Sequence, residues 1–428
     1  MTRASYCDGR SAMCIVFDCG DRKGLARSLT SPSLIFERRS RMNITSLLLG
    51  SAAALIAVSC ARAADAIVLA EPEPVEYVKI CGVYGAGYYY IPGTETCLRI
   101  GGYVRYDIGL GDVVSYDQAR TTDVKTGEAQ GIWQNHTRFT FKTWTGQETE
   151  LGTLQTYIET RMNYGKHTAY SGSDSPRYHA FSQGITLTFA WVQLGGLRVG
   201  KDWSAFDMFI GYAGDVLNQM LIPYGAFDTN VVQYYFDAGN GFSAVVSLEE
   251  GSGLVGTIDS YVPHLVGGVK YTQHWGAITG VVAYDSNYES VAGKVRIDVD
   301  VTDQLSLFGM FGYGSSGKLN DDVTNAIDAH GRGFYKSWGG NWAFWAGATY
   351  KLNETTSLNL QLSGDQLRNY GVAANVAYTF LADFTITAEL DYDRYGDFAV
   401  GKVDPSISWA NANKKSSVGG ILRFERSF

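Results

Sequence analysis

The sequence predicts an all-β fold: a 16-stranded antiparallel transmembrane β-barrel with a long third loop folded into the lumen. Three observations favour this class. First, apolar and polar side chains alternate along many segments from residue 98 onward, which is the period of a β-strand. Second, the connections between these segments alternate between short and long. Third, the chain of 428 residues is rich in Gly (50), Tyr (28) and Phe (20) but has only 18% charged residues, a composition typical of strands and turns.

The first 63 residues are predicted to lie outside this fold. Residues 1–41 show no helix or strand period, and we expect them to be an unstructured, non-native upstream extension. Residues 42–63 contain an apolar stretch too short to span a membrane and end in a small-x-small cleavage motif. This pattern predicts a signal peptide that is cut between Ala63 and Ala64. A lipoprotein anchored at Cys60 is the alternative.

The part of the chain after the signal peptide is acidic. Nine of the 35 Lys and Arg residues and four of the 43 Asp and Glu residues precede residue 64, which leaves a net charge of −13. Recognition of nucleic acid begins with a basic patch, so no nucleic acid is expected as a partner. No cofactor is predicted.

Residues 64–97 form a predicted periplasmic leader. Its beginning has no sustained period and contains Glu-Pro-Glu-Pro. Cys81 and Cys97 enclose fifteen residues, and in an exported chain such a pair is expected to form a disulfide. Neither cysteine has a histidine or another cysteine at ligand spacing, so no metal site is predicted.

Residues 98–428 are predicted to form the barrel. Its strands are expected at 98–110, 132–145, 150–165, 183–194, 195–200, 229–237, 241–250, 264–275, 276–286, 289–301, 304–314, 338–351, 355–364, 369–380, 383–396 and 417–428. In the first strand the even positions are apolar, while the odd positions include Arg99, Arg105 and Asp107. Such a strand belongs either to a soluble sheet with one face in water or to a membrane barrel around a water-filled lumen.

The lengths of the connections decide between the two. Short connections, such as GQET, AGN, TDQ, NET and LA, follow even-numbered strands. The long connections follow odd-numbered strands, at 111–131, 166–182, 201–228, 251–263, 315–337 and 397–416. In an up-and-down barrel this arrangement places all long loops on one rim, as in bacterial outer-membrane barrels. Aromatic girdles at the two membrane interfaces are expected to include Trp338, Trp342, Trp345, Tyr350 and Tyr378.

Several stretches resemble one family. They include VEYVKICGVYGAGYYYIPGTETCLRIGGYVRYD, QLGGLRVG, GYAGDVLN, GNGFSAVVSLEEG and the terminal GGILRFERSF, and in this order they are similar to the general diffusion porins of Alphaproteobacteria. The resemblance runs from about Met42 to Phe428. It implies a homotrimer in the bacterial outer membrane that passes small hydrophilic solutes and ions. Thr45 stands where the signal of this family usually has a lysine.

A barrel of this size needs an element that narrows it. Sixteen strands leave an aqueous channel, and the candidate for the constriction is the connection 201–228, KDWSAFDMFIGYAGDVLNQMLIPYGAFD. It exceeds the ~12–15 residues beyond which an irregular loop is usually functional. Its many apolar side chains would be costly in solvent, so we expect the loop to enter the barrel and pack on the wall.

Charged residues on and opposite this loop are the candidate site. Asp207 and Asp215 of the loop are expected to face the pore. Alternation places four bases on the lumen side of the first three strands: Arg105, Arg138, Lys142 and Arg161. Acids facing bases would create a transverse field that orients dipolar solutes and resists apolar ones, as in similar porins. Alternatively, each base only solvates the lumen and pairs with Asp107 or Glu159.

Two other functions stay open: an outer-membrane barrel enzyme, and a surface adhesion or receptor barrel. The six histidines show no paired spacing, and no G-x-S-x-G nucleophile motif is present, which argues against an enzyme. Long external loops could bind other factors in addition to forming a pore.

The chain ends on a predicted strand, 417–428, that closes the barrel. The last strand must pair with the first so that no edge faces lipid. Phe428 and Phe424 lie on the apolar register and are expected to point outward at this seam, whereas Arg426 interrupts the register. In similar barrels the terminal aromatic residue also marks the chain for the insertion machinery.

Overall fold

The computed structural model describes residues 79–111, 121–126, 129–130, 133–169, 177–219, 222–225, 227–315, 333–394, 396 and 416–428. The chain divides into two units, Met1–Pro74 and Val75–Phe428. The predicted extension, the signal peptide with its cleavage site at Ala63 and Ala64, and the start of the leader lie outside the described residues. Everything below concerns the second unit.

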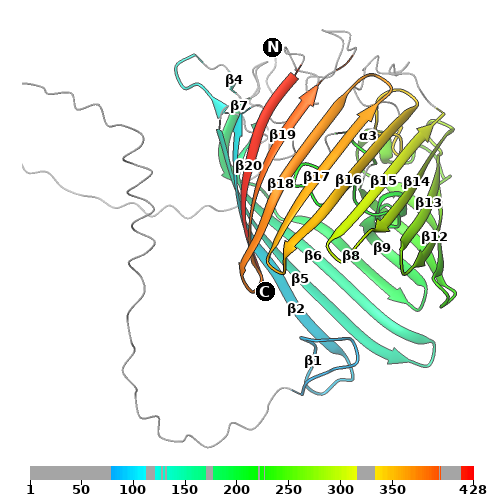
Figure 1. Cartoon of the computed structure of the whole chain (residues 1–428). Helices are drawn as coiled ribbons and strands as arrows, with labels where there is room; N and C mark the ends of the chain where they lie inside the picture. Colours follow the sequence, from blue (N-terminus) through cyan, green and yellow to red (C-terminus); the bar gives the residue numbers. More distant parts are fainter. Residues whose placement is uncertain are drawn as a thin grey trace, which may run out of the picture. The chain divides into compact units, whose positions relative to one another are not determined.

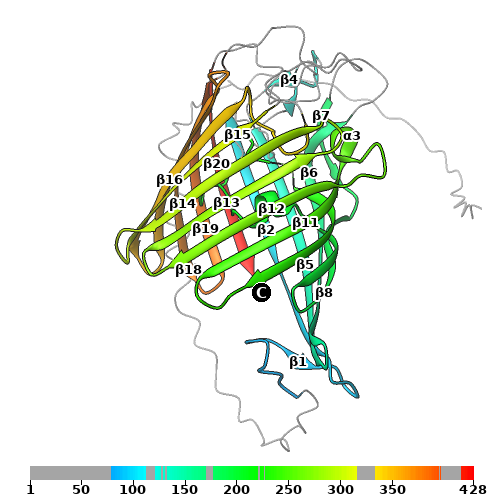
Figure 2. The same ribbon diagram turned by 90° about the vertical axis from the view of Figure 1, so that its right-hand side faces the viewer.

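The second unit is a β-barrel (Figures 1 and 2). Its strands are β1 (Tyr89–Tyr90), β2 (Cys97–Gly111), β3 (Thr121–Thr122), β4 (Ala129–Gln130), β5 (Trp133–Thr149), β6 (Gly152–Ala169), β7 (Arg177–Ser182), β8 (Thr186–Leu194), β9 (Leu197–Trp203), β10 (Asp228–Asp237), β11 (Phe242–Gly251), β12 (His264–Gln273), β13 (Gly276–Asp285), β14 (Ser290–Asp300), β15 (Leu305–Gly314), β16 (Trp342–Asn353), β17 (Thr356–Asp365), β18 (Tyr370–Leu381), β19 (Phe384–Arg394) and β20 (Ser416–Ser427). Two short helices are α2 (Ala205–Met208) and α3 (Gly253–Gly256).

Sixteen of these strands form the wall, and the predicted 16-stranded antiparallel barrel is confirmed. They are β2, β5, β6 and β8 to β20, each antiparallel to its neighbours, and β20 pairs with β2 to close the ring. β7 pairs with the end of β6, whose beginning pairs with β8. β1 pairs with the start of β2, and β3 and β4 form a separate two-stranded sheet.

The two rims differ as the sequence predicts. Turns of two to four residues join β5 to β6, β8 to β9, β12 to β13, β14 to β15, β16 to β17 and β18 to β19. The strand ends that the long connections join lie at the opposite rim (Figure 1). Some boundaries differ from the prediction: the GQET segment belongs to β5, and β7 occupies part of the predicted loop 166–182.

The start of β16 corrects two expectations. The predicted strand 338–351 begins only at Trp342, because Trp338 leaves the wall and packs inside against Trp345, with ring centroids 5.6 Å apart. Both of these indoles are fully buried, so they do not belong to the aromatic girdles. Trp342, by contrast, is exposed, as are the predicted girdle residues Tyr350 and Tyr378.

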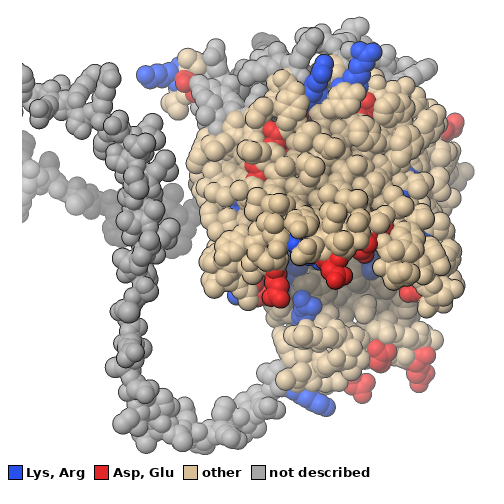
Figure 3. All heavy atoms as spheres, in the orientation of Figure 1, with Lys and Arg blue, Asp and Glu red and all other residues tan. Residues whose placement is uncertain are grey.

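The barrel is apolar outside and polar inside. On β17, for example, Leu358, Leu360 and Leu362 are exposed, whereas the alternate residues Asn359 and Gln361 are buried. Figure 3 shows a broad outer band with few Lys, Arg, Asp or Glu side chains. This pattern is the inverse of a soluble protein and matches a wall that faces hydrocarbon around a polar interior. Among the described residues, no helix is long and apolar enough to cross a membrane.

A small disulfide-bonded module precedes the barrel. Cys81 is joined to Cys97, the first residue of β2, which confirms the predicted disulfide. The Tyr84 hydroxyl donates to Glu148 Oε1 at 2.9 Å, so the module also contacts β5. It lies beyond the rim that carries the short turns (Figures 1 and 2).

The C-terminal residue extends the seam between β2 and β20. The backbone N–H and C=O of Phe428 are each hydrogen-bonded to Gly102 at 3.1 Å, and its ring stacks on Phe139 at 6.4 Å. Phe428 is 59% exposed. The Arg426 guanidinium reaches the short turn at the rim, where it donates to Ala382 O at 2.7 Å and pairs with Asp383 at 3.1 Å. This contact explains a charged residue in the outward register.

Candidate functional site

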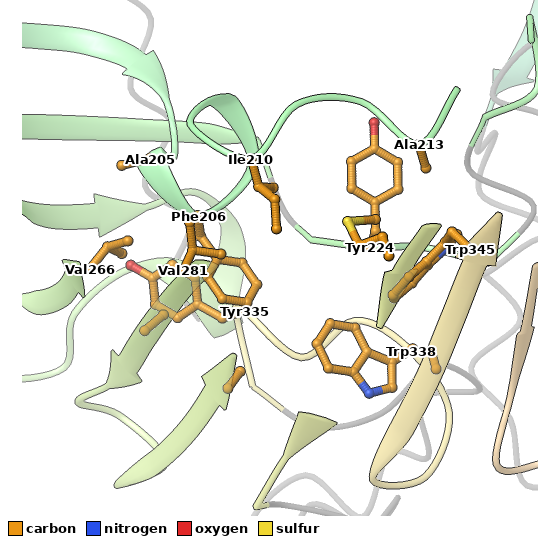
Figure 4. Close-up of a cluster of buried hydrophobic side chains, with 14 of the residues drawn as sticks. Ala205, Phe206, Ile210, Ala213, Tyr224, Val266, Val281, Tyr335, Trp338 and Trp345 are labelled. Atoms are coloured by element: carbon orange, nitrogen blue, oxygen red, sulfur yellow. The ribbon is translucent and has the colours of Figure 1, made fainter. Parts of the chain in front are cut away.

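The connection between β9 and β10 packs its apolar residues on the inner face of the wall. It begins with α2, whose N-terminus is capped by the Ser204 hydroxyl accepting from Phe206 N at 3.1 Å. Phe206, Ile210 and Tyr224 are buried in one cluster with wall residues such as Val281 and Trp345 (Figure 4). This segment, residues 204–225, is called the constriction loop below.

Hydrogen bonds tie the far part of the constriction loop to four consecutive strands. The Trp345 indole of β16 donates to Ile222 O at 2.8 Å, and the Gln361 amide of β17 donates to Gln219 O at 3.1 Å. On β18, the Asn375 amide donates to Asp215 O at 3.1 Å. On β19, Glu389 accepts from the backbone N–H groups of residues 217 and 218 at 2.6 and 2.7 Å. The loop therefore lies along the inside of the barrel.

Gly214 allows one of these close approaches. Its backbone has φ of 100°, which favours glycine. A Cβ atom there would lie 3.0 Å from both Gln361 Oε1 and the Phe308 ring. A side chain at this position would push the loop away from the wall.

The structure corrects the expected role of Asp207. Its carboxylate is 1% exposed and pairs with Lys294 Nζ on β14 at 2.6 Å, so it does not face open water. Lys294 also donates to Tyr224 O at 2.7 Å. Burial raises the pKa of the Asp207 carboxyl to about 6, and the Lys294 ammonium opposes this shift. Asp207 fastens the loop to the wall instead of lining the pore.

Asp215 is exposed at the edge of a cavity of about 320 Å³. The Thr349 hydroxyl donates to its Oδ2 at 3.1 Å. Arg296 also lines this cavity, pairs with Asp298 at 2.6 Å and donates to Tyr212 O. The exposed Asp300 lines the same cavity. The acidic side of the site thus comprises Asp215 and, in addition, Asp300, which the sequence analysis did not select, whereas the charge of Asp298 is offset by Arg296.

Two of the predicted bases lie opposite each other on neighbouring strands. Arg105 of β2 and Arg138 of β5 are register partners, and both are buried. Asp107 forms an ion pair with Arg105 at 2.9 Å and accepts a hydrogen bond from Arg423 Nε of β20 at 2.7 Å. Arg138 donates to Asn163 at 2.8 Å. These arginines are neutralised in part by their neighbours.

The other two bases are more accessible, and one of them, Arg161, lies near the constriction loop. Lys142 and Arg161 are 26% and 23% exposed, and both pair with Glu159, at 3.5 and 2.7 Å. The Arg161 guanidinium lies 5.8 Å from the ring of Trp203, which contacts Tyr212 of the loop edge-on at 5.7 Å. Trp203 therefore connects Arg161 to the constriction loop.

Sequence reasoning missed Lys294, Arg296 and Arg423, all of which have side chains directed to the inside of the barrel. The alternation of polar and apolar residues could have identified these three bases as inward-facing, because each lies on the polar face of its strand. The partners could not be assigned in this way, since Asp207 and Lys294 are 87 positions apart. No three His, Cys, Asp or Glu side chains within the described part are placed to hold a metal ion.

Comparisons with known proteins agree with this architecture. Residues 65–421 match the family described as "Porin subfamily". The chain is 47% identical over 395 residues to porin Omp2b of Brucella canis and 46% identical to porin Omp2b of Brucella suis, with 90% of this chain and 100% of each relative covered. Among solved structures it is similar to the outer membrane channel DcaP of Acinetobacter baumannii, with a TM-score of 0.54, 13% identity, and coverage of 79% of this chain and 99% of that chain. This last likeness shows the fold alone.

Proposed function

The chain belongs to the porin family and forms a diffusion channel in the bacterial outer membrane, and from this premise we propose that the constriction loop selects solutes by size and by a transverse charge field. The observation that carries the proposal is the set of hydrogen bonds that hold the loop on the inner faces of β16 to β19. A loop held there reduces the cross-section available to water and solutes.

The charge field has two sides in this proposal. Asp215 and Asp300 form the acidic side, since Arg296 offsets the charge of Asp298. Lys142 and Arg161 form the accessible part of the basic side. Charges of opposite sign across a narrow aqueous passage orient dipolar solutes and disfavour apolar ones. Arg105 and Arg138 are buried, so they add to the potential but do not contact solutes.

The channel is proposed to act as a homotrimer that passes small hydrophilic solutes and ions. Family membership supports the homotrimer, and the exposed apolar side chains of the outer face support a place in a lipid membrane. We also propose that outer-membrane lipid surrounds it and that the insertion machinery assembles it. The porin family is one of channels, so the protein is not an enzyme.

Neutralising one acid tests the charge field. Asp215→Asn is expected to shift selectivity toward anions, and Lys142→Gln with Arg161→Gln toward cations. A unit charge 4 Å from an ion contributes about 1 kcal/mol in water, so the permeability ratio should change by up to about fivefold. The reversal potential of single channels in planar bilayers under a KCl gradient measures this ratio.

Asp237→Asn is the matched control. Asp237 is exposed at the end of β10, beside the short turn to β11, and does not line the cavity that holds Asp215. This variant should keep the wild-type reversal potential. If both site variants also keep it, the charge field is not at this loop.

A further inference from the structure

The connection between β15 and β16 enters the barrel at its described end. Residues 333–341 directly precede β16, and Phe334, Tyr335, Lys336 and Trp338 among them are buried. Connections at a rim normally run over the surface and stay in contact with water. The 333–341 segment is instead packed as a core element, beside the constriction loop (Figure 4).

One carboxylate joins the 333–341 segment to the start of the constriction loop. Glu249 of β11 is buried and accepts from Ser204 Oγ at 2.7 Å and Ala205 N at 2.8 Å, both at the N-terminus of α2. Its Oε2 also accepts from the Tyr335 hydroxyl at 2.9 Å. The Tyr335 ring packs edge-on against Phe206 of α2, with centroids 5.3 Å apart (Figure 4). Tyr335 thus contacts both the helix and the acceptor that caps it.

Phe334 anchors the 333–341 segment to the wall. Its ring stacks on His264 of β12 at 5.7 Å, and its backbone N–H donates to Asp285 of β13 at 2.7 Å. Gly251 and Gly256 face this ring so closely that a side chain at either position would overlap it. The 333–341 segment is therefore held on the wall by contacts that do not involve the constriction loop.

The other end of the 333–341 segment reaches the far part of the constriction loop. Trp338 packs against Trp345, whose indole N–H donates to Ile222 O at 2.8 Å. Asp365 of β17 accepts from Gly339 N at 3.0 Å and fixes this end as well. The segment consequently supports the constriction loop near both of its ends.

We propose that the 333–341 segment is a second element of the constriction and that Tyr335 is a positioning residue, which holds α2 at one distance from the wall and so sets the aperture. The inference rests on the proposed role of the constriction loop. It adds that the aperture depends on a connection more than one hundred residues farther along the chain, through Tyr335, Glu249 and Phe206.

Tyr335→Phe tests the proposal because it removes only the hydroxyl. Loss of a buried hydrogen bond to a charged acceptor raises the population of displaced loop conformations by about tenfold. Single trimers in planar bilayers should therefore show current fluctuations about tenfold more frequent than wild type. Tyr335→Ala should in addition raise the size of polyethylene glycol that enters the pore.

Tyr313→Phe is the matched control, since Tyr313 lies on the same hairpin but is exposed on the outer face. It should behave as wild type. If Tyr335→Phe trimers carry wild-type currents without added fluctuations, the positioning role is overturned, even where their yield falls. Tyr335→Phe decides the question if Tyr335→Ala does not assemble.

The two proposals fail in different ways. If Asp215→Asn shifts the reversal potential while Tyr335→Phe leaves the current unchanged, the constriction stands and the role of Tyr335 falls. If neither variant has an effect, the constriction loop itself does not control passage.

Discussion

At the scale of single residues, the ion pair of Asp207 and Lys294 shows how two buried charges can attach a loop to the wall of a water-filled barrel. Both side chains are fully buried, and Lys294 Nζ also lies 4.0 Å from the ring centroid of Phe206. Removing two ions from water is costly, and their attraction repays this cost only when both are present with good geometry. The pair therefore gives the constriction loop one preferred position and penalises any displacement that separates the charges.

Removing one charge of this pair should destabilise the protein far more than replacing both charged residues with apolar ones. Asp207→Leu leaves Lys294 buried without its partner and should lower the free energy of unfolding by about 3–5 kcal/mol. Lys294→Met should have a similar cost. Asp207→Leu combined with Lys294→Met removes both charges and should recover most of the loss. Urea-induced unfolding of the refolded protein in lipid vesicles measures the three variants; a double variant as unstable as the two single losses together would contradict the buried pair.

At the scale of elements, β20 closes the barrel. Its pairing with β2 and β19 leaves no open edge, and Phe428 adds two backbone hydrogen bonds beyond the last residue of the strand. An unpaired strand edge in hydrocarbon would leave polar backbone groups unsatisfied. The seam is thus completed by the final residue.

Deleting Phe428 should reduce assembly more than conduction. The deletion removes two backbone hydrogen bonds to Gly102, each worth about 0.5–1.5 kcal/mol, together with the ring that stacks on Phe139. Because Phe428 lies outside the lumen, channels that do form should conduct as wild type. Heat-modifiable folded protein in membrane extracts and single-channel conductance report the two effects. Phe428→Tyr keeps the aromatic ring and should assemble normally, and a normal yield without Phe428 would exclude its assembly role.

At the scale of the whole molecule, the distribution of polarity is reversed relative to a soluble protein. Exposed Val, Leu, Ile and aromatic residues cover the outside, and the interior holds charged residues with ion-pair or hydrogen-bond partners, such as Asp107, Glu159 and Glu249. Sixteen strands enclose more space than wall side chains fill, so two inward segments occupy part of it. The remaining passage conducts.

The proposed homotrimer predicts a specific conductance pattern. Each insertion event in a planar bilayer should close in three equal steps when voltage is raised, because three identical pores enter together. Chemical cross-linking of the native protein should give a species of three times the monomer mass. Insertions that close in a single step, with no cross-linked trimer, would show that one barrel acts alone.

The sequence by itself determined the strand count, the inner or outer side of many wall residues, the rim of each long connection and the disulfide. These features depend on local rules, since the pleat sends alternate side chains to opposite faces and a short turn forces antiparallel neighbours. Arg105 and Arg161 could be placed on the inner face for this reason. Trp338 could not, because a strand-like pattern continues through residues that leave the wall.

Only the tertiary structure decided which inner side chains meet. The prediction of a pore-facing Asp207 was wrong because α2 turns its carboxylate toward Lys294, and the link from Tyr335 through Glu249 to Ser204 joins three separate segments. Periodicity reports the face on which a residue lies but carries no information on the path of an irregular segment. That path follows from burial of apolar surface and from pairing of charges across the barrel, both of which depend on residues far apart in the chain.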